Sequence, residues 1–462
     1  MKVQTHPALQ ALCKMLSACR HAFAHLDWRK GSGDVTEPAL SDEQLSIYEA
    51  LENSNAHAFI TGKAGTGKSV LLRYFARNTR KVIIKVAPTG IAALNIGGQT
   101  IHSLFKLPTG LIDPKTVTVS TELQETLRHV DTIIIDEISM VRADTIDAID
   151  RILRISKSNQ APFGNTQLIM VGDVYQLPPV VVGAELQHYF TARYGGAYFF
   201  NAHVWKKTEL VTYELQTVFR QADADFRDLL NAVRDGSYAK ENLQRLAARV
   251  VAATNAPTDA ITLTSTNKAA QLINEARLAA LRNKTKIYHA TLTGDLPHSA
   301  LPTDEKLALC VGAQVVFVRN DPEGKWVNGT TGIVASLKKD HVRIKCGKST
   351  YDVVPTVWDQ SNYVYDEELS MMRQEIVGTF TQFPIKLAWA ITIHKSQGCT
   401  YDEVVVDLRR GAFAHGQTYV ALSRCRSLDG LYLLGDVKPR DIIIDPVVTK
   451  FMGQIQTPVA PQ

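Results

Sequence analysis

The sequence has no run of about 18 apolar residues, the length at which a helix begins to span a lipid bilayer. It is also poor in cysteine: its 462 residues include six cysteines, with neither a C-x-x-C pair nor a spacing typical of zinc ligands. These absences argue against a membrane span, a disulfide framework and a zinc module, and they predict free thiols in a reducing compartment. We therefore expect a cytoplasmic location, or a nuclear or mitochondrial one in a eukaryotic cell.

A strong charge of one sign is also missing. The 51 Lys and Arg residues exceed the 46 Asp and Glu residues by a net charge of +5, which permits a polyanionic partner without requiring one. Apolar residues make up 45% and charged residues 21%, as in ordinary globular proteins. A chain of 462 residues without an internal repeat is too long for a single core, so about two to four domains are expected.

Residues 1–36 differ from the rest of the chain. Acidic residues are absent up to Leu26, while Lys2, Lys14 and Arg20 are present. Apolar residues at helical spacing predict an amphipathic helix, which a Gly-Ser-Gly turn ends. A targeting presequence and an accessory helix would both have this composition, and the sequence leaves both interpretations open.

The most informative motif is Gly62–Ser69, which fits G-x-x-x-x-G-K-[ST]. Apolar residues before and after it predict a short buried strand and the start of a helix. In that context the glycines turn successive backbone N–H groups toward one anion, and the helix N-terminus adds partial positive charge. Lys68 is then expected to reach the β- and γ-phosphates of a nucleoside triphosphate, and Ser69 to hold Mg²⁺. The other residues expected to bind the nucleotide are Gly62, Gly65, Thr66 and Gly67.

Two apolar runs end in polar residues suited to hydrolysis. Residues 133–135 are followed by Asp136 and Glu137, and carboxylates at the end of a parallel strand lie beside the phosphate loop. Asp136 is expected to hold Mg²⁺ through water, and Glu137 to orient and deprotonate the attacking water. Gln176 follows the run 167–171 and is placed to sense the γ-phosphate, although a plain turn would read the same way.

Two arginines, Arg220 and Arg424, each stand at the end of a predicted element. Phosphoryl transfer needs positive charge opposite the phosphate loop, and an arginine finger contributes about 10³–10⁵ in rate. Either arginine alone would be read as half of a surface salt bridge. Together with Glu137 and Gln176, they favour a hydrolytic site built from two parts of the chain.

Nine motifs follow one another along the chain: Leu40–Gln44, Gly62–Ser69, Ala87–Ala93, Thr100–Phe105, Asp136–Met140, Gly172–Val180, Thr266–Lys268, Ile393–Gly398 and Tyr419–Arg424. Taken in order, they resemble those of the Pif-type (petite integration frequency) DNA helicases, in the B branch of superfamily 1. The resemblance covers roughly residues 40–435. Segment 147–167 resembles the one that marks the Pif type, except that Asn165 replaces a usual glycine; Asn tolerates a positive φ, so we expect the turn to be kept.

The resemblance implies an α/β fold of two tandem recombinase-like P-loop NTPase domains with parallel sheets, a small insert in the first and a small β-barrel insert in the second. A change to Val-, Thr-, Tyr- and Gly-rich sequence after Val311 agrees with the barrel. The expected parts are an N-terminal extension (1–36), a first motor domain (37–212) with a wedge-bearing insert (about 102–130), a second motor domain (213–310 and 385–445), the β-rich insert (311–384) and a C-terminal tail (446–462).

The resemblance also implies residue roles. Gln44 would read the adenine of ATP, although Ser41 and Gln44 also have the spacing of a helix capping box. Gly398 would lie near the nucleotide across the cleft. Phe105 would stack on a base, or be an ordinary core residue. The positions that match the family's single-strand path are Thr89, Gly90, His102, Ser103, Asn267, His394, Lys395 and Ser396.

The implied function is a DNA-stimulated ATPase and helicase, which uses ATP and Mg²⁺ and moves 5′→3′ along single-stranded DNA. Forked or structured DNA, including G-quadruplexes, would be its substrate, and repair, recombination or genome maintenance its role. We expect a monomeric motor. Two alternatives stay open at this point: a RecD-like motor subunit of a helicase–nuclease complex, and a nucleotide-switched binding protein.

Overall fold

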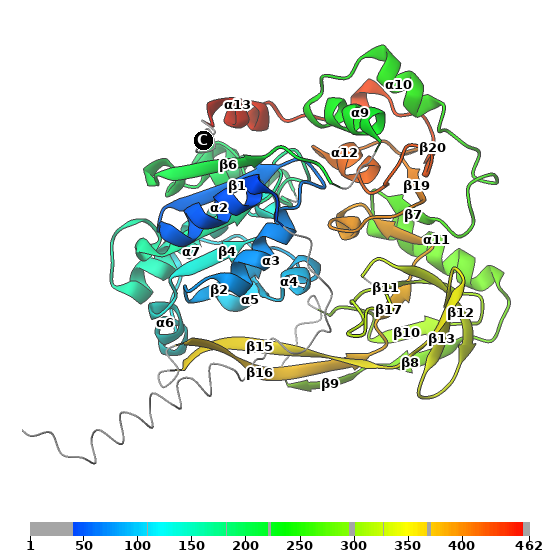
Figure 1. The fold of residues 1–462 in the computed structure, drawn as a ribbon, viewed down its shortest axis with the longest axis horizontal. Helices are drawn as coiled ribbons and strands as arrows, with labels where there is room; N and C mark the ends of the chain where they lie inside the picture. The colour runs from blue at the N-terminus through cyan, green and yellow to red at the C-terminus, as the bar shows by residue number, and fades with distance from the viewer. Residues whose placement is uncertain are drawn as a thin grey trace, which may run out of the picture.

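The computed structural model describes residues 40–455, apart from 109, 182, 220–222, 295–300, 327 and 367–370. The predicted N-terminal helix and Arg220 lie outside the described residues. Figure 1 shows two α/β bodies side by side, with a β-rich part below the second body and a long hairpin reaching from it beneath the first. Among the described helices, none combines the length and apolarity needed to cross a bilayer.

The first domain is built on a parallel sheet of order β3-β2-β4-β5-β1-β6. Its central strands β1, β4 and β5 are almost entirely buried, as expected when helices cover both faces of a sheet. The strands are β1 His57–Gly62, β2 Ile83–Ala87, β3 Gln99–Thr100, β4 Thr132–Ile135, β5 Gln167–Val171 and β6 Leu210–Leu215. The helices are α2 Asp42–Asn53, α3 Lys68–Asn78, α4 Gly90–Ile96, α5 Ile101–Leu104, α6 Thr121–Arg128, α7 Ala143–Lys157 and α8 Ala184–Tyr194.

The predicted boundary between the two motor domains, at 212/213, is wrong. Strand β6 continues to Leu215 and pairs with β1 along its whole length, with Tyr213 opposite Ile60. The first sheet therefore needs this strand as its edge. A strand at a domain boundary has the same sequence pattern whichever sheet it joins, which explains the error.

The second domain has a smaller parallel sheet of order β18-β7-β19-β20. Its strands are β7 Ile261–Thr264, β18 Ala390–Thr392, β19 Val404–Asp407 and β20 Leu431–Leu434. Its helices are α9 Ala224–Asp235, α10 Lys240–Ala247, α11 Asn267–Ala280 and α12 Gln417–Leu422. The apolar runs 260–264, 404–408 and 431–434 of the sequence thus form β7, β19 and β20 to within one residue.

The β-rich insert begins earlier than predicted. Strands β8 and β10 pair with each other, and β9 pairs with β16, so the insert starts at Lys286 rather than at 311. A turn precedes β12: Gly329 has φ +92°, two residues before the strand begins. The strands are β8 Lys286–His289, β9 Thr291–Gly294, β10 Lys306–Leu309, β11 Gln314–Phe317, β12 Thr331–Leu337, β13 Val342–Cys346, β14 Ser349–Val353, β15 Thr356–Asp366, β16 Met371–Gln382 and β17 Ile385–Leu387.

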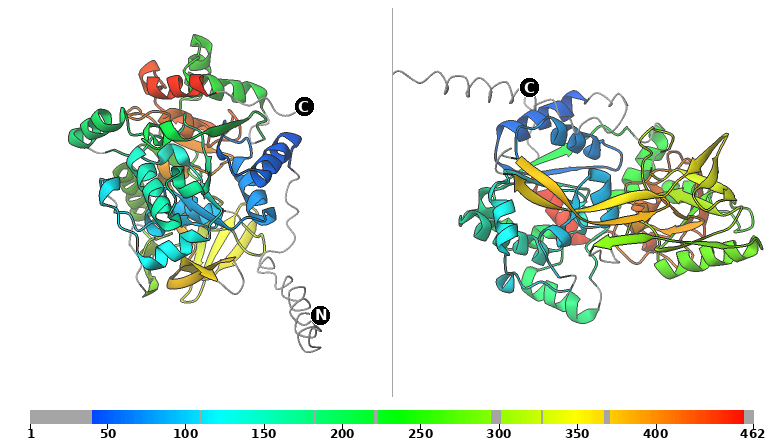
Figure 2. Two further views of the ribbon diagram at one scale, coloured as in Figure 1. Left: turned by 90° about the vertical axis from the view of Figure 1, so that its left-hand side faces the viewer. Right: turned by 90° about the horizontal axis from the view of Figure 1, so that it is seen from below.

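Two segments cross back to the first domain. The long β15–β16 hairpin runs beneath both domains and lies against α6, as the view from below shows (Figure 2). After the second sheet, the chain returns as α13, Pro446–Gln454, and packs beside the first domain (Figure 1). There Phe451 stacks on Phe200 with ring centroids 3.9 Å apart, and Val448 is fully buried. The predicted C-terminal tail therefore includes a docked helix.

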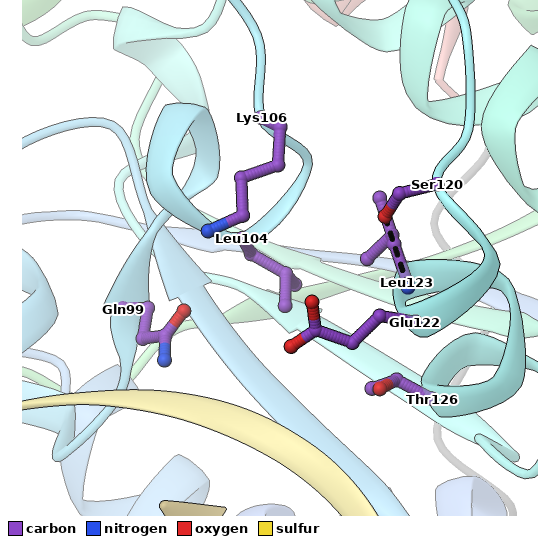
Figure 3. A pocket seen from close by; sticks show the side chains of 7 residues that line it. All are labelled: Gln99, Leu104, Lys106, Ser120, Glu122, Leu123 and Thr126. Atoms are coloured by element: carbon purple, nitrogen blue, oxygen red, sulfur yellow. Dashed lines mark hydrogen bonds between the residues drawn. The ribbon is translucent and has the colours of Figure 1, made fainter. Parts of the chain in front are cut away.

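The predicted insert at about 102–130 is packed on the first domain's own core. Leu104 and Leu123 are both buried there, and Figure 3 shows them with Lys106 and Glu122 around a small pocket. The segment is thus continuous with the domain that carries it.

The Pif-type segment has a structural explanation. One carboxylate oxygen of Asp150 in α7 accepts from Phe163 N at 2.7 Å and from Arg154 Nε at 2.8 Å, which fixes the turn at 162–165. Asp147, one turn earlier, accepts the backbone N–H groups of residues 203 and 204. Asn165 has φ +64°, so the predicted tolerance of a positive φ is confirmed.

Candidate functional site

The phosphate loop joins β1 to α3, as the sequence predicted. Gly65 and Gly67 have φ +85° and +81°, and a Cβ on Gly67 would lie 2.4 Å from Gln44 Nε2. Lys68 Nζ donates to Gly62 O at 2.7 Å and to Lys63 O at 2.9 Å, so the ammonium group lies within the turn of the loop. The loop therefore has the concave shape, the helix N-terminus and the cation that a triphosphate needs.

Gln44 forms the capping box that the sequence left open. Its Oε1 accepts from Ser41 N at 3.1 Å, while Ser41 Oγ accepts from Gln44 N at 3.3 Å. Its Nε2 donates to Gly67 O at 3.4 Å. The side chain thus caps α2 and at the same time touches the phosphate loop. Contact with adenine remains a prediction.

Phe219 is a site residue that sequence reasoning missed. Its N–H donates to Gly65 O at 2.9 Å, and its ring carbons lie 3.6 Å from the position a Cβ would take on Gly67. The side chain is nevertheless 59% exposed. An exposed aromatic ring held against the phosphate loop offers a flat face for a base. Its position directly before Arg220 was the available signal.

The acidic pair lies at the carboxyl end of β4. Glu137 adopts φ +51°, which is unusual for a residue with a side chain, and its N–H donates to Asp136 Oδ1 at 2.9 Å. Burial raises the pKa of Asp136 to about 6. Burial, followed by the charge of Asp136, raises the pKa of Glu137 to about 7. A carboxylate whose pKa lies near neutrality suits general-base catalysis.

A second-domain glutamine completes this cluster. Gln397 Nε2 donates to Glu137 Oε2 and to Gln176 Oε1, both at 3.1 Å. Both glutamines are buried, with 8% and 6% of their surfaces exposed. Gln397 belongs to a motif that the sequence analysis identified, but its role was not predicted.

Arg424 lies in the same interface and is 2% exposed. Its guanidinium donates to Val420 O at 2.9 Å, to Cys399 O at 3.3 Å and to Ser423 Oγ at 2.8 Å. Burial lowers its pKa, and the nearby Cys399 and Glu137 partly oppose that effect. These three hydrogen-bond acceptors are neutral, so none of them forms an ion pair with the guanidinium. The predicted counterpart, Arg220, lies outside the described residues.

The arrangement also fits a magnesium ion. Mg²⁺ keeps several waters and takes one or two protein ligands besides phosphate oxygens. Ser69 at the start of α3 and the Asp136 carboxylate, whose raised pKa reflects burial, meet that need. Within the described part of the chain, no group of three His, Cys, Asp or Glu side chains could hold a metal by itself.

Most residues predicted to line the DNA path lie at helix starts or short turns. Thr89 caps α4, where Gly90 is the first residue, and Asn267 begins α11. His102 and Ser103 lie in α5, and His394 and the exposed Lys395 in a short turn after β18. Burial lowers the pKa of His102, with a further effect from Arg142, and burial also lowers the pKa of His394. Both imidazoles would therefore act as neutral hydrogen-bonding groups.

Two of the expected DNA contacts are buried. Phe105 is 1% exposed and belongs to the first domain's core, so the second of its two expected roles, an ordinary core residue, is the one that the structure supports. Ser396 is fully buried, with Oγ donating to Ile393 O at 2.7 Å. Gly398 faces Asn95 of α4 across the cleft, and its predicted place beside the nucleotide remains a prediction.

Comparison with known proteins points to a single family. A family model described as PIF1-like helicase matches residues 39–244. The ATP-dependent DNA helicase Pif1 of Bdellovibrio bacteriovorus is 34% identical over 446 residues, which cover 93% of this chain and 96% of that protein. The ATP-dependent DNA helicase PIF1 of Homo sapiens is 35% identical over 439 residues, and the match spans 91% of this chain but 64% of that longer protein.

Solved structures give the same result. Bacteroides Pif1 in complex with ADP-AlF4 has a TM-score of 0.83 and 34% identity, covering 90% of this chain and 97% of that one. The same Bacteroides protein bound to single-stranded DNA has a TM-score of 0.67 at 35% identity and the same coverage. The tandem recombinase-like domains inferred from the sequence are thus confirmed. By motif, fold and identity over nearly its whole length, the chain belongs to the PIF1-like helicase family.

Proposed function

We propose that this chain is an ATP-dependent DNA helicase, which moves 5′→3′ along single-stranded DNA and opens forked or structured DNA. The observation that carries the proposal is the hydrogen bond from Gln397 to Glu137. It joins the candidate base in the first domain to a segment of the second domain that contains Lys395, a predicted DNA contact. The residue that contacts the candidate base and the residue predicted to contact DNA therefore lie in the same short segment of the chain.

In the chemical step, Lys68 neutralises the phosphates and Glu137 orients the attacking water and accepts its proton. Gln176 contacts the γ-phosphate, and its hydrogen bond with Gln397 transmits the position of that phosphate to the second domain. Arg424 supplies positive charge from the second domain, and we assign the same task to Arg220. Magnesium, held by Ser69 and Asp136, would offset the negative charge that builds up on the phosphates.

The base of ATP would lie against Phe219 and Gln44, which both lie close to Gly67. Stacking on an aromatic ring tolerates any base, at about 1–3 kcal/mol. The amide of Gln44 would have to supply any preference for adenine. Its cap of α2 holds it in place for this contact.

Movement follows from the two-domain construction of the site. Binding of ATP draws the domains together, and hydrolysis removes the γ-phosphate that Gln176 and Arg424 hold. The domains then separate and grip the strand in turn. Separating one DNA base-pair step costs about 1.4 kcal/mol on average, well within what one hydrolysed ATP supplies. Repair, recombination or genome maintenance would use such a motor, and a relative's structure at forked DNA supports the fork as a substrate.

The proposal is tested by measuring ATP hydrolysis with and without single-stranded DNA. We expect strong stimulation by DNA, since the DNA-contacting segment touches the catalytic base. A rate that is the same with and without DNA would contradict the proposal. It would favour a nucleotide-switched binding protein instead.

A further inference from the structure

We infer that Tyr419 is a positioning residue, which acts with the ion pair between Asp173 and Arg234 to fasten the phosphate loop to the second domain and so to set Arg424 opposite Glu137. The inference deepens the proposed function and rests on it. None of these three residues was assigned a role from the sequence. Each is buried in the interface between the motor domains, with 3%, 0% and 5% of its surface exposed, respectively.

The hydroxyl of Tyr419 bridges two segments of the first domain. It accepts a hydrogen bond from Ala64 N, within the phosphate loop, at 2.9 Å. It donates one to Asp173 Oδ2, in the loop after β5, at 3.3 Å. This loop also carries Gln176. A single hydroxyl of the second domain therefore forms hydrogen bonds with both segments that face the triphosphate.

The same helix carries the effect to the arginine. Tyr419 lies in α12, and the adjacent Val420 accepts the Arg424 Nε–H at 2.9 Å. A shift of the phosphate loop that moves Tyr419 therefore moves the anchor of Arg424. The short helix α12 and the residues at its C-terminal end therefore connect the phosphate loop to the Arg424 guanidinium.

The ion pair fixes the direction of approach. Arg234 in α9 donates to Asp173 through Nη2 at 2.9 Å and through Nε at 3.1 Å, and its guanidinium lies 4.3 Å from the ring centre of Tyr175. Burial alone would raise the pKa of Asp173, but Arg234 holds it below its usual value. Buried ion pairs add little net stability and are sensitive to geometry. This pair therefore serves to align the domains.

Apolar contacts surround the polar ones. Ala64 and Leu177, both from the first domain, pack into the second domain's hydrophobic cluster, and Leu177 is fully buried. The nucleotide-responsive loops are thus part of the second domain's core in this arrangement. A movement of either loop must therefore displace residues of the second domain.

The test uses Tyr419→Phe, which removes only the hydroxyl. We expect kcat for DNA-stimulated ATP hydrolysis to fall about tenfold, with KM for ATP within about threefold of wild type. Hydrogen exchange at 61–66 should become faster, since Ala64 N–H loses its acceptor. Tyr432→Phe in β20 is the matched control, because its hydroxyl also donates to a carboxylate, that of Glu403, at 3.3 Å, but this hydrogen bond is exposed to solvent. It should change neither measurement.

A second variant tests whether the three residues act together. Arg234→Lys keeps the charge and loses the two-pronged geometry. We expect a similar loss of kcat, and the double variant should lose no more than about threefold beyond either single change. If the losses of kcat in the two single variants multiplied in the double variant, the two residues would act independently, and the inference would be overturned.

Other results decide against it as clearly. A Tyr419→Phe protein with wild-type kcat and wild-type exchange would overturn the inference, and so would a lower melting temperature with unchanged kcat. If the wild-type protein showed no DNA-stimulated hydrolysis, the proposed function would fail. The exchange of the Ala64 amide would then still decide whether Tyr419 holds the loop.

Discussion

Gln397 in the second domain donates one hydrogen bond to Glu137 and another to Gln176, each 3.1 Å long. The candidate base and the candidate phosphate sensor are therefore held by one amide group. Because Gln397 follows directly on the turn with His394 and Lys395, a strand bound at that turn can change the environment of the base.

The first prediction concerns pH. Burial and the neighbouring Asp136 raise the pKa of Glu137 to about 7 in the protein without nucleotide. Glu137 must be ionised to act as a base, so kcat/KM for ATP should fall as pH decreases through about 7. The pH dependence of kcat/KM reports the pKa values of groups in the free enzyme, which is the state to which the raised pKa of Glu137 refers. A profile that stays flat down to pH 5 would contradict the assignment.

A second prediction uses Gln397→Glu, which places another carboxylate against Glu137. Like charges at this distance raise each other's pKa. The acid limb of the kcat/KM profile should therefore move to higher pH, and kcat at neutral pH should fall. Gln271→Glu adds the same charge on the exposed face of α11 and should leave the profile in place.

A third prediction concerns Arg424. Arg424→Lys keeps a positive charge but cannot reproduce the donors to Val420, Cys399 and Ser423. We expect kcat to fall by about 10³-fold, the lower end of the effect of an arginine finger, with binding of a fluorescent ATP analogue retained. Arg426→Lys, whose side chain is 59% exposed, should hydrolyse ATP normally. Normal turnover in Arg424→Lys would remove Arg424 from the catalytic site.

A fourth prediction concerns Phe219. If its exposed ring stacks on the base, Phe219→Ala should raise KM for ATP by about tenfold, since stacking contributes about 1–3 kcal/mol. Phe219→Trp should keep KM near the wild-type value, because it retains an aromatic face. Equal KM values for the alanine and tryptophan variants would show that the ring does not contact the base.

A fifth prediction concerns α13. The Phe451 ring stacks on Phe200 and also lies close to Phe59, Phe199 and Trp205. Phe451→Ala should therefore lower the free energy of unfolding by about 2 kcal/mol, less than for a fully buried phenylalanine. Urea denaturation measures this. Phe413→Ala, which changes a 63% exposed ring, serves as the control, and equal urea midpoints for the two variants would show that α13 is not docked.

Much of the site could be predicted because its chemistry is local in sequence. The phosphate loop and the Asp136–Glu137 pair each follow an apolar strand, and the apolar runs 133–135 and 167–171 lie within strands β4 and β5. Asn165 could be predicted to keep its turn, since the required φ depends on the residue alone.

The errors arose where tertiary packing decides. Phe105 and Ser396 lie in motifs that match a DNA path, yet both are buried, and burial depends on segments far away in sequence. Arg234 in the last turn of α9 has the sequence pattern of a surface residue. Its buried ion pair is evident only in the folded structure, where Asp173, 61 positions earlier in the chain, lies beside it. Interface residues such as these become visible only when two domains are placed together.

The central claim is that ATP hydrolysis drives 5′→3′ movement along DNA. Its most direct test compares unwinding of two duplexes with the same paired region, one with a 5′ single-stranded tail and one with a 3′ tail, with Mg²⁺ in the presence and absence of ATP. We predict ATP-dependent unwinding of the 5′-tailed duplex alone, and its loss in Glu137→Gln. Unwinding of the 3′-tailed duplex alone, or of neither, would contradict the account.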